Sequence, residues 1–154
     1  MTFSAITIKA AAGAAGITAA GLLTATTAFA AAPTFARFGT TEQFAGARGQ
    51  EVTDYTVRDL LPSGHNDGVW YSDVTVKAVK GDVTPIVGDF NARAANGATY
   101  TSIEGANPYG LTNQPLRQGA QATGRIYFQV NNGAPPDSVV YSPGGAVNLL
   151  TWQG

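Results

Sequence analysis

The sequence predicts an all-β domain, built as one antiparallel β-sandwich of seven or eight strands. Three observations predict it. Apolar and polar residues alternate with a period of two in several runs after residue 36, which places apolar side chains on one face of a strand. The periodicity of an amphipathic helix does not recur in this part of the chain. Turn-forming residues separate the runs roughly every 8 to 12 positions, a spacing typical of sandwiches and barrels.

Four runs carry the strand pattern. Residues 52–58 are rich in β-branched and aromatic side chains, and residues 69–79 form the longest alternating run. Residues 125–130 and 147–152 repeat the alternation. Each run is therefore expected to be a strand with one buried face. The residues expected on the buried faces of the first two runs are Tyr55, Val57, Val74, Val76 and Ala78.

Turn formers lie between these runs. Asp67-Gly68, Asn96-Gly97 and Asn132-Gly133 supply residues that tolerate the positive φ of tight hairpin turns. Pro85 predicts an edge strand or a bulge, because proline has no amide hydrogen to donate. Pro135-Pro136 marks a loop. The order of the strands in the sheets does not follow from these signals.

Residues 1–30 have the pattern of a helical signal peptide. Lys9 is the only charge before a stretch from residue 10 to residue 36 that has none. A positive start, an apolar stretch and a small-residue cleavage site together are typical of export signals. The alternative is an uncleaved membrane anchor, which needs about 20 predominantly apolar residues. The stretch is long enough, but it consists mostly of Ala, Gly and Thr, so its gain from staying in lipid is modest.

The triplet Ala28-Phe29-Ala30 presents small residues at the two positions that a signal peptidase recognises. We therefore expect cleavage between Ala30 and Ala31, with cleavage after Ala32 as the alternative. Residues 31–154 then form the mature domain. This domain is expected to be extracellular and to have no stable membrane insertion after cleavage.

Charge and cysteine content exclude several classes of function. The chain has nine basic and ten acidic residues, and removal of Lys9 with the signal leaves eight basic residues against the ten acidic ones. A mature charge near −2 argues against a nucleic-acid partner, which selects for a basic surface. The chain has no cysteine, which excludes thiol chemistry, cysteine-bound metals and disulfides.

One stretch is distinctive, residues 83–93 with the sequence Val-Thr-Pro-Ile-Val-Gly-Asp-Phe-Asn-Ala-Arg. Together with Gly68-Val69-Trp70, with residues 124–128 (Gly-Arg-Ile-Tyr-Phe) and with the final Leu-Leu-Thr-Trp at residues 149–152, it resembles the mycobacterial immunoprotective extracellular protein family. The resemblance extends from about Pro33 to Trp152.

The resemblance implies an immunoglobulin-like β-sandwich and secretion into the medium. It also implies that the protein is immunogenic and that it has a suspected role in contacts with host cells. It implies no enzymatic reaction. It defines no functional residues that could be carried over to this chain. A shared fold does not by itself carry a function.

Candidate catalytic chemistry is weak. His65, the only histidine, could act as a general base or a metal ligand beside Asp67, or it could be a solvated loop histidine. A triad of Ser63 or Ser72 with His65 and Asp67 lacks the Gly-x-Ser-x-Gly turn of hydrolases. Loop carboxylates could bind calcium, or they could cap backbone amides; the candidates are Asp67, Asp73, Asp82 and Asp89. We predict no catalytic, cofactor-binding or metal-binding residues and no cofactor.

Aromatic residues and one long loop supply the candidate recognition surface. Neighbours such as Trp70 and Tyr71 point to opposite faces of a strand, so one of them is expected outside the core. The loop at residues 103–118, which contains Tyr109, is either a binding loop or a simple connection. Arg93 could bind a ligand carboxylate or phosphate, or it could pair with an acid across strands.

The residues expected at the recognition surface are therefore Trp70, Tyr71, Arg93 and Tyr109. The sequence favours a secreted, non-enzymatic binding domain whose partner is an unknown protein or surface component. The alternatives are a structural protein associated with the cell envelope and, less favoured, a small-molecule-binding protein or a hydrolase.

Overall fold

The structure is a computed structural model, and it describes residues 33–46, 49–105, 107–145 and 149–154. The predicted signal peptide and its cleavage site between Ala30 and Ala31 lie outside the described residues. Within the described residues, no helix is long and apolar enough to cross a lipid bilayer.

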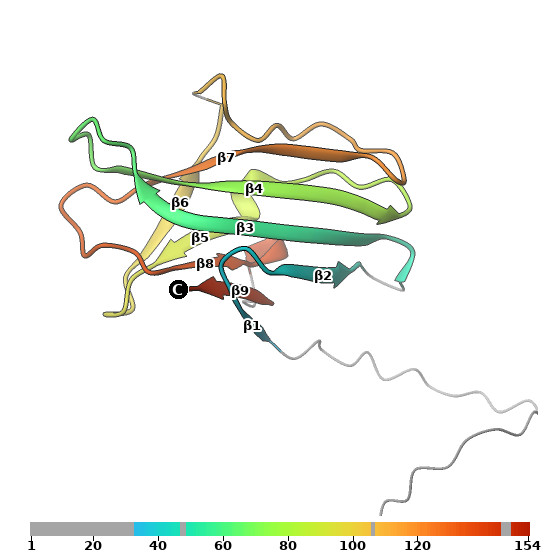
Figure 1. The fold of residues 1–154 in the computed structure, drawn as a ribbon, viewed down its shortest axis with the longest axis horizontal. Helices are drawn as coiled ribbons and strands as arrows, with labels where there is room; N and C mark the ends of the chain where they lie inside the picture. Colours follow the sequence, from blue (N-terminus) through green and yellow to red (C-terminus); the bar gives the residue numbers. More distant parts are fainter. Residues whose placement is uncertain (1–32, 47–48, 106, 146–148) are drawn as a thin grey trace, which may run out of the picture. The chain divides into compact units, whose positions relative to one another are not determined.

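In the described residues, nine strands form one continuous sheet that folds over at β6 into two packed layers, here called sheet A and sheet B (Figure 1). Sheet A has the order β1-β9-β8-β5-β6, with bounds Thr34–Arg37, Leu150–Gln153, Ser138–Tyr141, Phe90–Arg93 and Thr99–Ile103. Sheet B has the order β6-β7-β4-β3-β2, and its further strands span Gln121–Gln129, Val69–Lys80, Val52–Pro62 and Thr41–Ala45. These elements confirm the all-β, immunoglobulin-like sandwich.

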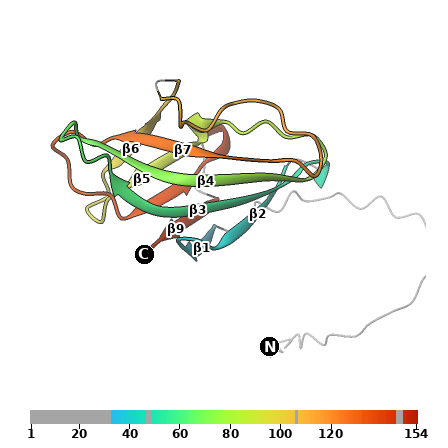
Figure 2. The same ribbon diagram turned by 45° about the horizontal axis from the view of Figure 1, so that its top comes forward.

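Strand β6 belongs to both sheets. Its first part, Thr99 to Thr101, pairs with β5 in sheet A, and its last two residues, Ser102 and Ile103, pair with β7 in sheet B. The turned view shows β6 crossing between the two layers beside β5 and β7 (Figure 2). One side of the sandwich is therefore closed by a shared strand, and no free edge remains there.

The opposite side of the sandwich is closed by the segment between β1 and β2. The amide of Phe38 donates to the carbonyl of Gln153 in sheet A at 3.1 Å, and the amide of Gly39 donates to the carbonyl of Val57 in sheet B at 2.7 Å. The indole Nε1 of Trp152, whose side chain is fully buried, donates to the carbonyl of Thr40 at 2.9 Å. This crossing segment thus holds the two sheets together.

The core lies between the sheets and is rich in aromatic and β-branched side chains. The hydroxyl of Tyr55 in sheet B donates to the hydroxyl of Tyr141 in sheet A at 3.2 Å, within the buried interior. Burial raises the pKa of both phenols, so they stay neutral. The fully buried large side chains include Val57, Val74, Val76, Phe90, Ile126, Phe128, Val139 and Trp152.

Four sequence expectations need correction. The sandwich has nine strands in the described residues, not seven or eight, because the short strands β1 and β2 lack a strong alternation. One pair, β1 with β9, is parallel, so the sandwich is not wholly antiparallel. In the Asn132-Gly133 turn the positive φ falls on Asn131 at 51°, not on Gly133. Pro85 is fully buried in the connection before β5 and belongs to no strand.

The main runs are confirmed. Strand β3 begins at Val52 and β4 at Val69, and the five residues predicted on their inner faces are all buried. The run at 125–130 lies in β7 as far as Gln129, and Val130 follows the end of the strand. The last run is confirmed from Leu150 onward in β9, whereas residues 147 and 148 lie outside the described part of the chain.

Candidate functional site

The outer face of sheet B carries an ion pair and two tyrosines where β4 lies beside β7. Tyr71 lies opposite Tyr127, and Asp73 lies opposite Arg125. Directly opposed residues on one face of an antiparallel pair have side chains close enough to interact. The two phenol rings have centroids 6.1 Å apart, and Nε of Arg125 donates to Oδ1 of Asp73 at 3.1 Å.

A loop covers this face beyond the end of β6. After Ile103 the described residues up to β7 form no further strand, but the backbone is fixed at two bridges, Gly110 with Arg125 and Leu116 with Val83. The amide of Leu111 donates to the carbonyl of Arg125, and the amide of Arg125 donates to the carbonyl of Tyr109, both at 2.8 Å. The side chain of Leu111 is buried in the core. The loop is therefore fixed to β7 and is not a simple connection.

Gly124 permits this close approach. A Cβ atom at position 124 would lie 2.6 Å from both Cα and the backbone nitrogen of Leu111, a separation that real contacts do not reach. A glycine inside a strand often marks such an approach of another backbone. The φ of Gly124 is not positive, so its backbone conformation does not require glycine. The close approach of Leu111 does.

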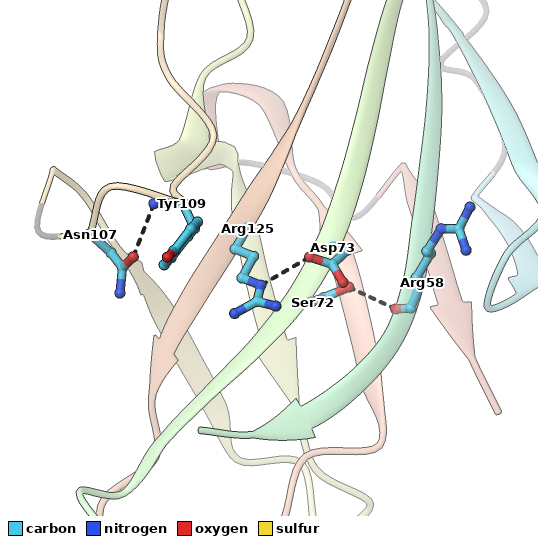
Figure 3. A network of polar contacts seen from close by, with 6 residues as sticks. All are labelled: Arg58, Ser72, Asp73, Asn107, Tyr109 and Arg125. Carbon is cyan, nitrogen blue, oxygen red and sulfur yellow. Dashed lines mark hydrogen bonds and ion pairs between the residues drawn. The ribbon is translucent and has the colours of Figure 1, made fainter. Parts of the chain in front are cut away.

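Arg125 lies between two tyrosine rings. Its guanidinium carbon is 4.3 Å from the ring centroid of Tyr71 and 5.7 Å from that of Tyr109, distances at which a cation is attracted to a ring face. Figure 3 shows Tyr109 approaching from the loop, with Nε of Arg125 turned toward Asp73. The bond to Asp73 above all, with the hydroxyl of Tyr127 second, raises the pKa of Arg125.

The loop and β4 are also braced locally. The amide of Tyr109 donates to Oδ1 of Asn107 at 3.0 Å, and the amide of Gly110 donates to the carbonyl of Asn107 at 2.9 Å. Behind the ion pair, the hydroxyl of Ser72 donates to the carbonyl of Arg58 at 2.7 Å (Figure 3). That carbonyl lies in the bulge of β3 between Val57 and Leu60, so the bond ties β3 to β4.

These groups surround a hollow of about 290 Å³, which we call the tyrosine–arginine hollow. A second hollow of about 320 Å³ shares Ile103, Asn107, Arg125 and Tyr127 with it. Each is near the lower end of the range for ligand pockets, about 300–1,000 Å³. The tyrosine–arginine hollow is lined by Ser63, His65, Asp67, Val69, Tyr71, Ile103, Asn107, Tyr109, Arg125 and Tyr127.

The phenol oxygen of Tyr127 is buried and makes no hydrogen bond of good geometry within the described residues. It lies near the guanidinium of Arg125 and lines both hollows. A buried hydroxyl whose only contact with a donor is poorly aligned gains less than a full hydrogen bond. This atom is therefore a point at which a ligand or a water molecule gains a hydrogen bond.

His65 lies at one end of the hollow, but it is not the centre of a triad. The hydroxyl of Ser63 donates directly to Oδ1 of Asp67 at 2.6 Å, and the amide of His65 donates to the same hydroxyl at 3.2 Å. Oδ1 of Asp67 also accepts from the amide of Val69 at 2.9 Å. The bond from Ser63 above all lowers the pKa of Asp67. The serine hydroxyl is thus directed at the acid and not at the imidazole.

The four candidate calcium ligands lie at separate places. Asp67, Asp82 and Asp89 each accept from a backbone amide, those of Val69, Gln118 and Gly144. Asp73 pairs with Arg125. In the described part of the chain, no three of His, Asp and Glu come close enough together to hold a metal ion. The carboxylates cap amides and hold an arginine.

The structure brings together two of the four residues predicted at the recognition surface. Tyr71 and Tyr109 meet at Arg125. Trp70 lies on the same side of β4 as the buried Ser72, opposite Phe128, and does not line the hollow. Arg93 lies in β5, where it lines a separate hollow of about 470 Å³ on sheet A.

Sequence reasoning did not single out Arg125 or Asn107. The alternation in residues 121–129 places Arg125 on an outer face, but its partners depend on which strand lies beside β7. Asn107 two positions before Tyr109 is a typical turn signal, which could have indicated that the loop is ordered at this point.

Comparisons with known proteins give consistent results. The family model described as domain of unknown function DUF1942 matches residues 33–152. Immunogenic protein MPT63 of Mycobacterium tuberculosis and immunogenic protein MPB63 of Mycobacterium bovis are each 34% identical over 154 residues, which cover 95% of this chain and 96% of theirs. The crystal structure of MPT63, described as a secreted protein from Mycobacterium tuberculosis, aligns with a TM-score of 0.71 and 35% identity. The alignment covers 80% of this chain and 99% of that one.

Proposed function

The chain belongs to the DUF1942 family, and from this premise we propose that it is a secreted, non-enzymatic binding domain whose binding surface is the tyrosine–arginine hollow. The family membership also agrees with the resemblance carried by residues 83–93 and by the final Leu-Leu-Thr-Trp. The relatives are named as immunogenic proteins, and we extend immunogenicity to this chain as part of the proposal.

Secretion is supported by two independent observations. The solved relative is described as a secreted protein. The family match begins at residue 33, just after the cleavage site predicted between Ala30 and Ala31. The pattern of residues 1–30 thus precedes the family domain as an export signal precedes a mature protein.

The observation that carries the binding function is the fixed position of Tyr109. The residue is 69% exposed, yet its backbone is bonded to Asn107 and Arg125 and its ring lies against the guanidinium of Arg125. An exposed aromatic ring that is already ordered loses little entropy on binding. Rigid loops on a sheet scaffold commonly carry recognition.

The absence of catalysis is supported by the arrangement around His65. A nucleophilic serine needs its hydroxyl hydrogen-bonded to a base that is in turn oriented by a third group. Here the hydroxyl of Ser63 donates to Asp67, which leaves the imidazole outside the chain of hydrogen bonds.

The experiment begins with the full-length gene expressed in the producing organism. Intact-mass analysis of the medium is expected to find a chain that starts at Ala31. The protein from the medium is then immobilised and exposed separately to producer envelope extract and to host-cell surface extract. Tyr109→Ala is the test variant, and Phe35→Ala is its control, because Phe35 is 70% exposed on β1 and lines the hollow on sheet A, not the tyrosine–arginine hollow.

Retention of a component by the wild-type protein and by Phe35→Ala, but not by Tyr109→Ala, supports the proposed function. The extract that supplies the component distinguishes host contact from an envelope role. Equal retention by all three proteins, or by none, contradicts binding at this hollow. A full-length mass confined to membranes contradicts secretion.

A further inference from the structure

We propose that the tyrosine–arginine hollow and its neighbouring hollow form one groove for a neutral saccharide chain. This proposal rests on the proposed function, because it names the ligand class of the same site. It follows from the shape of the groove, its balance of charge, its exposed ring and its unused hydrogen-bonding groups.

The shape favours an extended ligand. The two hollows, about 290 and 320 Å³, share Ile103, Asn107, Arg125 and Tyr127. They therefore adjoin along the base of the loop, and together they offer room for linked rings. A single small ion or a lone amino acid would leave much of this surface uncovered.

The groove carries charges of both signs, which favours neither a cation nor an anion. The guanidinium of Arg125 lies between Tyr71 and Tyr109. Two aromatic rings could attract a ligand cation, but here the positive charge of Arg125 already occupies the space between them and repels a second cation. An anion meets carboxylates instead. Asp67 lines one hollow and Glu104 the other, and Oδ1 of Asp73 accepts from Nε of Arg125. The groove therefore favours a ligand without net charge.

The exposed ring suits the carbon face of a sugar. The face of a tyrosine ring is negative and attracts the positive edges of C–H bonds, which a pyranose presents along one side. Tyr109 offers such a face, since the residue is 69% exposed; its backbone is held by the bond to Asn107, and its ring lies against the guanidinium of Arg125.

The polar groups match hydroxyls. Asn107 uses Oδ1 to accept from the amide of Tyr109, and its amide nitrogen donates no hydrogen bond within the described residues. Asp67 uses Oδ1 for its bonds from Ser63 and Val69, so Oδ2 can accept. The buried hydroxyl of Tyr127 lacks a partner of good geometry. A sugar hydroxyl both donates and accepts, so it satisfies all three groups.

A proline-rich peptide is the strongest rival, because aromatic grooves also bind such segments. Its backbone offers carbonyl acceptors and few donors. The carboxylates of Asp67 and Glu104 would then lose water without gaining hydrogen bonds, which is costly. The carboxylates therefore favour the saccharide.

The test uses protein purified from the medium after expression of the full-length gene. It is exposed to a panel of neutral oligosaccharides of glucose, mannose, galactose and N-acetylglucosamine. The panel also holds sulfated and uronic-acid oligosaccharides and a proline-rich peptide. Affinities are measured by titration calorimetry for the wild-type protein, Tyr109→Ala and Phe35→Ala. Thermal unfolding verifies that both variants are folded.

We expect at least one neutral oligosaccharide to bind, with affinity lowered about tenfold or more by Tyr109→Ala and unchanged by Phe35→Ala. Periodate oxidation of its vicinal hydroxyls should abolish the binding. Preference for a charged oligosaccharide, equal affinity of the wild-type protein and Tyr109→Ala, or binding of the peptide alone overturns the proposal. If no ligand in the panel binds, the proposal is also overturned. If extract capture still depends on Tyr109 in that case, the proposed function stands and only the ligand class is wrong.

Discussion

Substitution of Gly124 by alanine tests whether the loop is held against β7 as the structure indicates. A Cβ atom at this position would lie 2.6 Å from the backbone of Leu111, whereas carbon atoms in contact are about 3.5 Å apart or more. The loop must therefore retreat by about 1 Å. The two hydrogen bonds between the loop and Arg125, each 2.8 Å long, would then exceed hydrogen-bonding distance.

The expected cost has three parts. Overpacking costs about 1–3 kcal/mol, and each lost hydrogen bond costs about 1 kcal/mol. Replacement of a flexible glycine in a strand by alanine stabilises the folded chain by about 0.5–1 kcal/mol, which offsets part of this cost. The free energy of unfolding should therefore fall by about 2–4 kcal/mol, which corresponds to a loss of roughly 8–15 °C in Tm for a domain of this size.

Denaturant unfolding and amide hydrogen exchange measure this effect. The amides of Leu111 and Arg125 should exchange faster in Gly124→Ala, since they donate the bonds that fix the loop. Gln121→Ala is the control, because Gln121 is an exposed residue of the same strand, and it should change stability by no more than about 0.5 kcal/mol. Unchanged stability and unchanged exchange at Leu111 in Gly124→Ala would refute the close approach and, with it, the fixed position of Tyr109.

Three further predictions concern other parts of the domain. Trp152→Phe leaves the carbonyl of Thr40 without its donor, so the free energy of unfolding should fall by about 1–3 kcal/mol. Denaturant unfolding measures this fall, and an unchanged midpoint would contradict a stabilising role for the crossing segment. Burial raises the pKa of Asp89 above its ordinary 3.8, so the protonated form contributes stability at low pH that is lost as pH rises through the folded-state pKa. Asp89→Asn should therefore be more stable than the wild-type protein at neutral pH and lose this advantage in acid, as followed by Tm against pH; a constant difference would show that the carboxyl does not titrate as inferred. Ser63→Ala should raise the pKa of Asp67 toward its ordinary value, measured by NMR titration of the carboxyl carbon, since the bond from Ser63 is the main cause of the depression; an unmoved titration would assign that role to the amide of Val69.

The local features of the fold could be predicted from the sequence because they depend on short-range periodicity. Val74, Val76 and Ala78 are two positions apart, so one strand places all three on the same face, and the structure buries them completely. The short strands β1 and β2 were not predicted, because four or five residues with few apolar side chains give no periodic signal.

The candidate site could be predicted only in part, because it depends on strand order. Tyr109 and Tyr71 could be singled out as aromatic residues in a loop and on an outer face. Arg125 and Asp73 are 52 positions apart in sequence, and only the register of β4 with β7 brings them together. Arg93 had an equally strong sequence signal, yet β5 places it on the other sheet.

The parallel pairing of β1 with β9 also sets the order of assembly. Thr34 pairs with Leu150, so the first strand of the domain meets its neighbour only after 116 further positions of chain have been supplied. The neighbouring strands β2, β3 and β4 pair with partners close in sequence, and contacts of short sequence separation form sooner than distant ones. The part of sheet B made of β2, β3 and β4 can therefore pair early, whereas β1 has no strand partner until the last four-residue strand is present. A chain truncated before Leu150 loses β9 and, with it, both the pairing partner of β1 and the indole of Trp152 that bonds to Thr40.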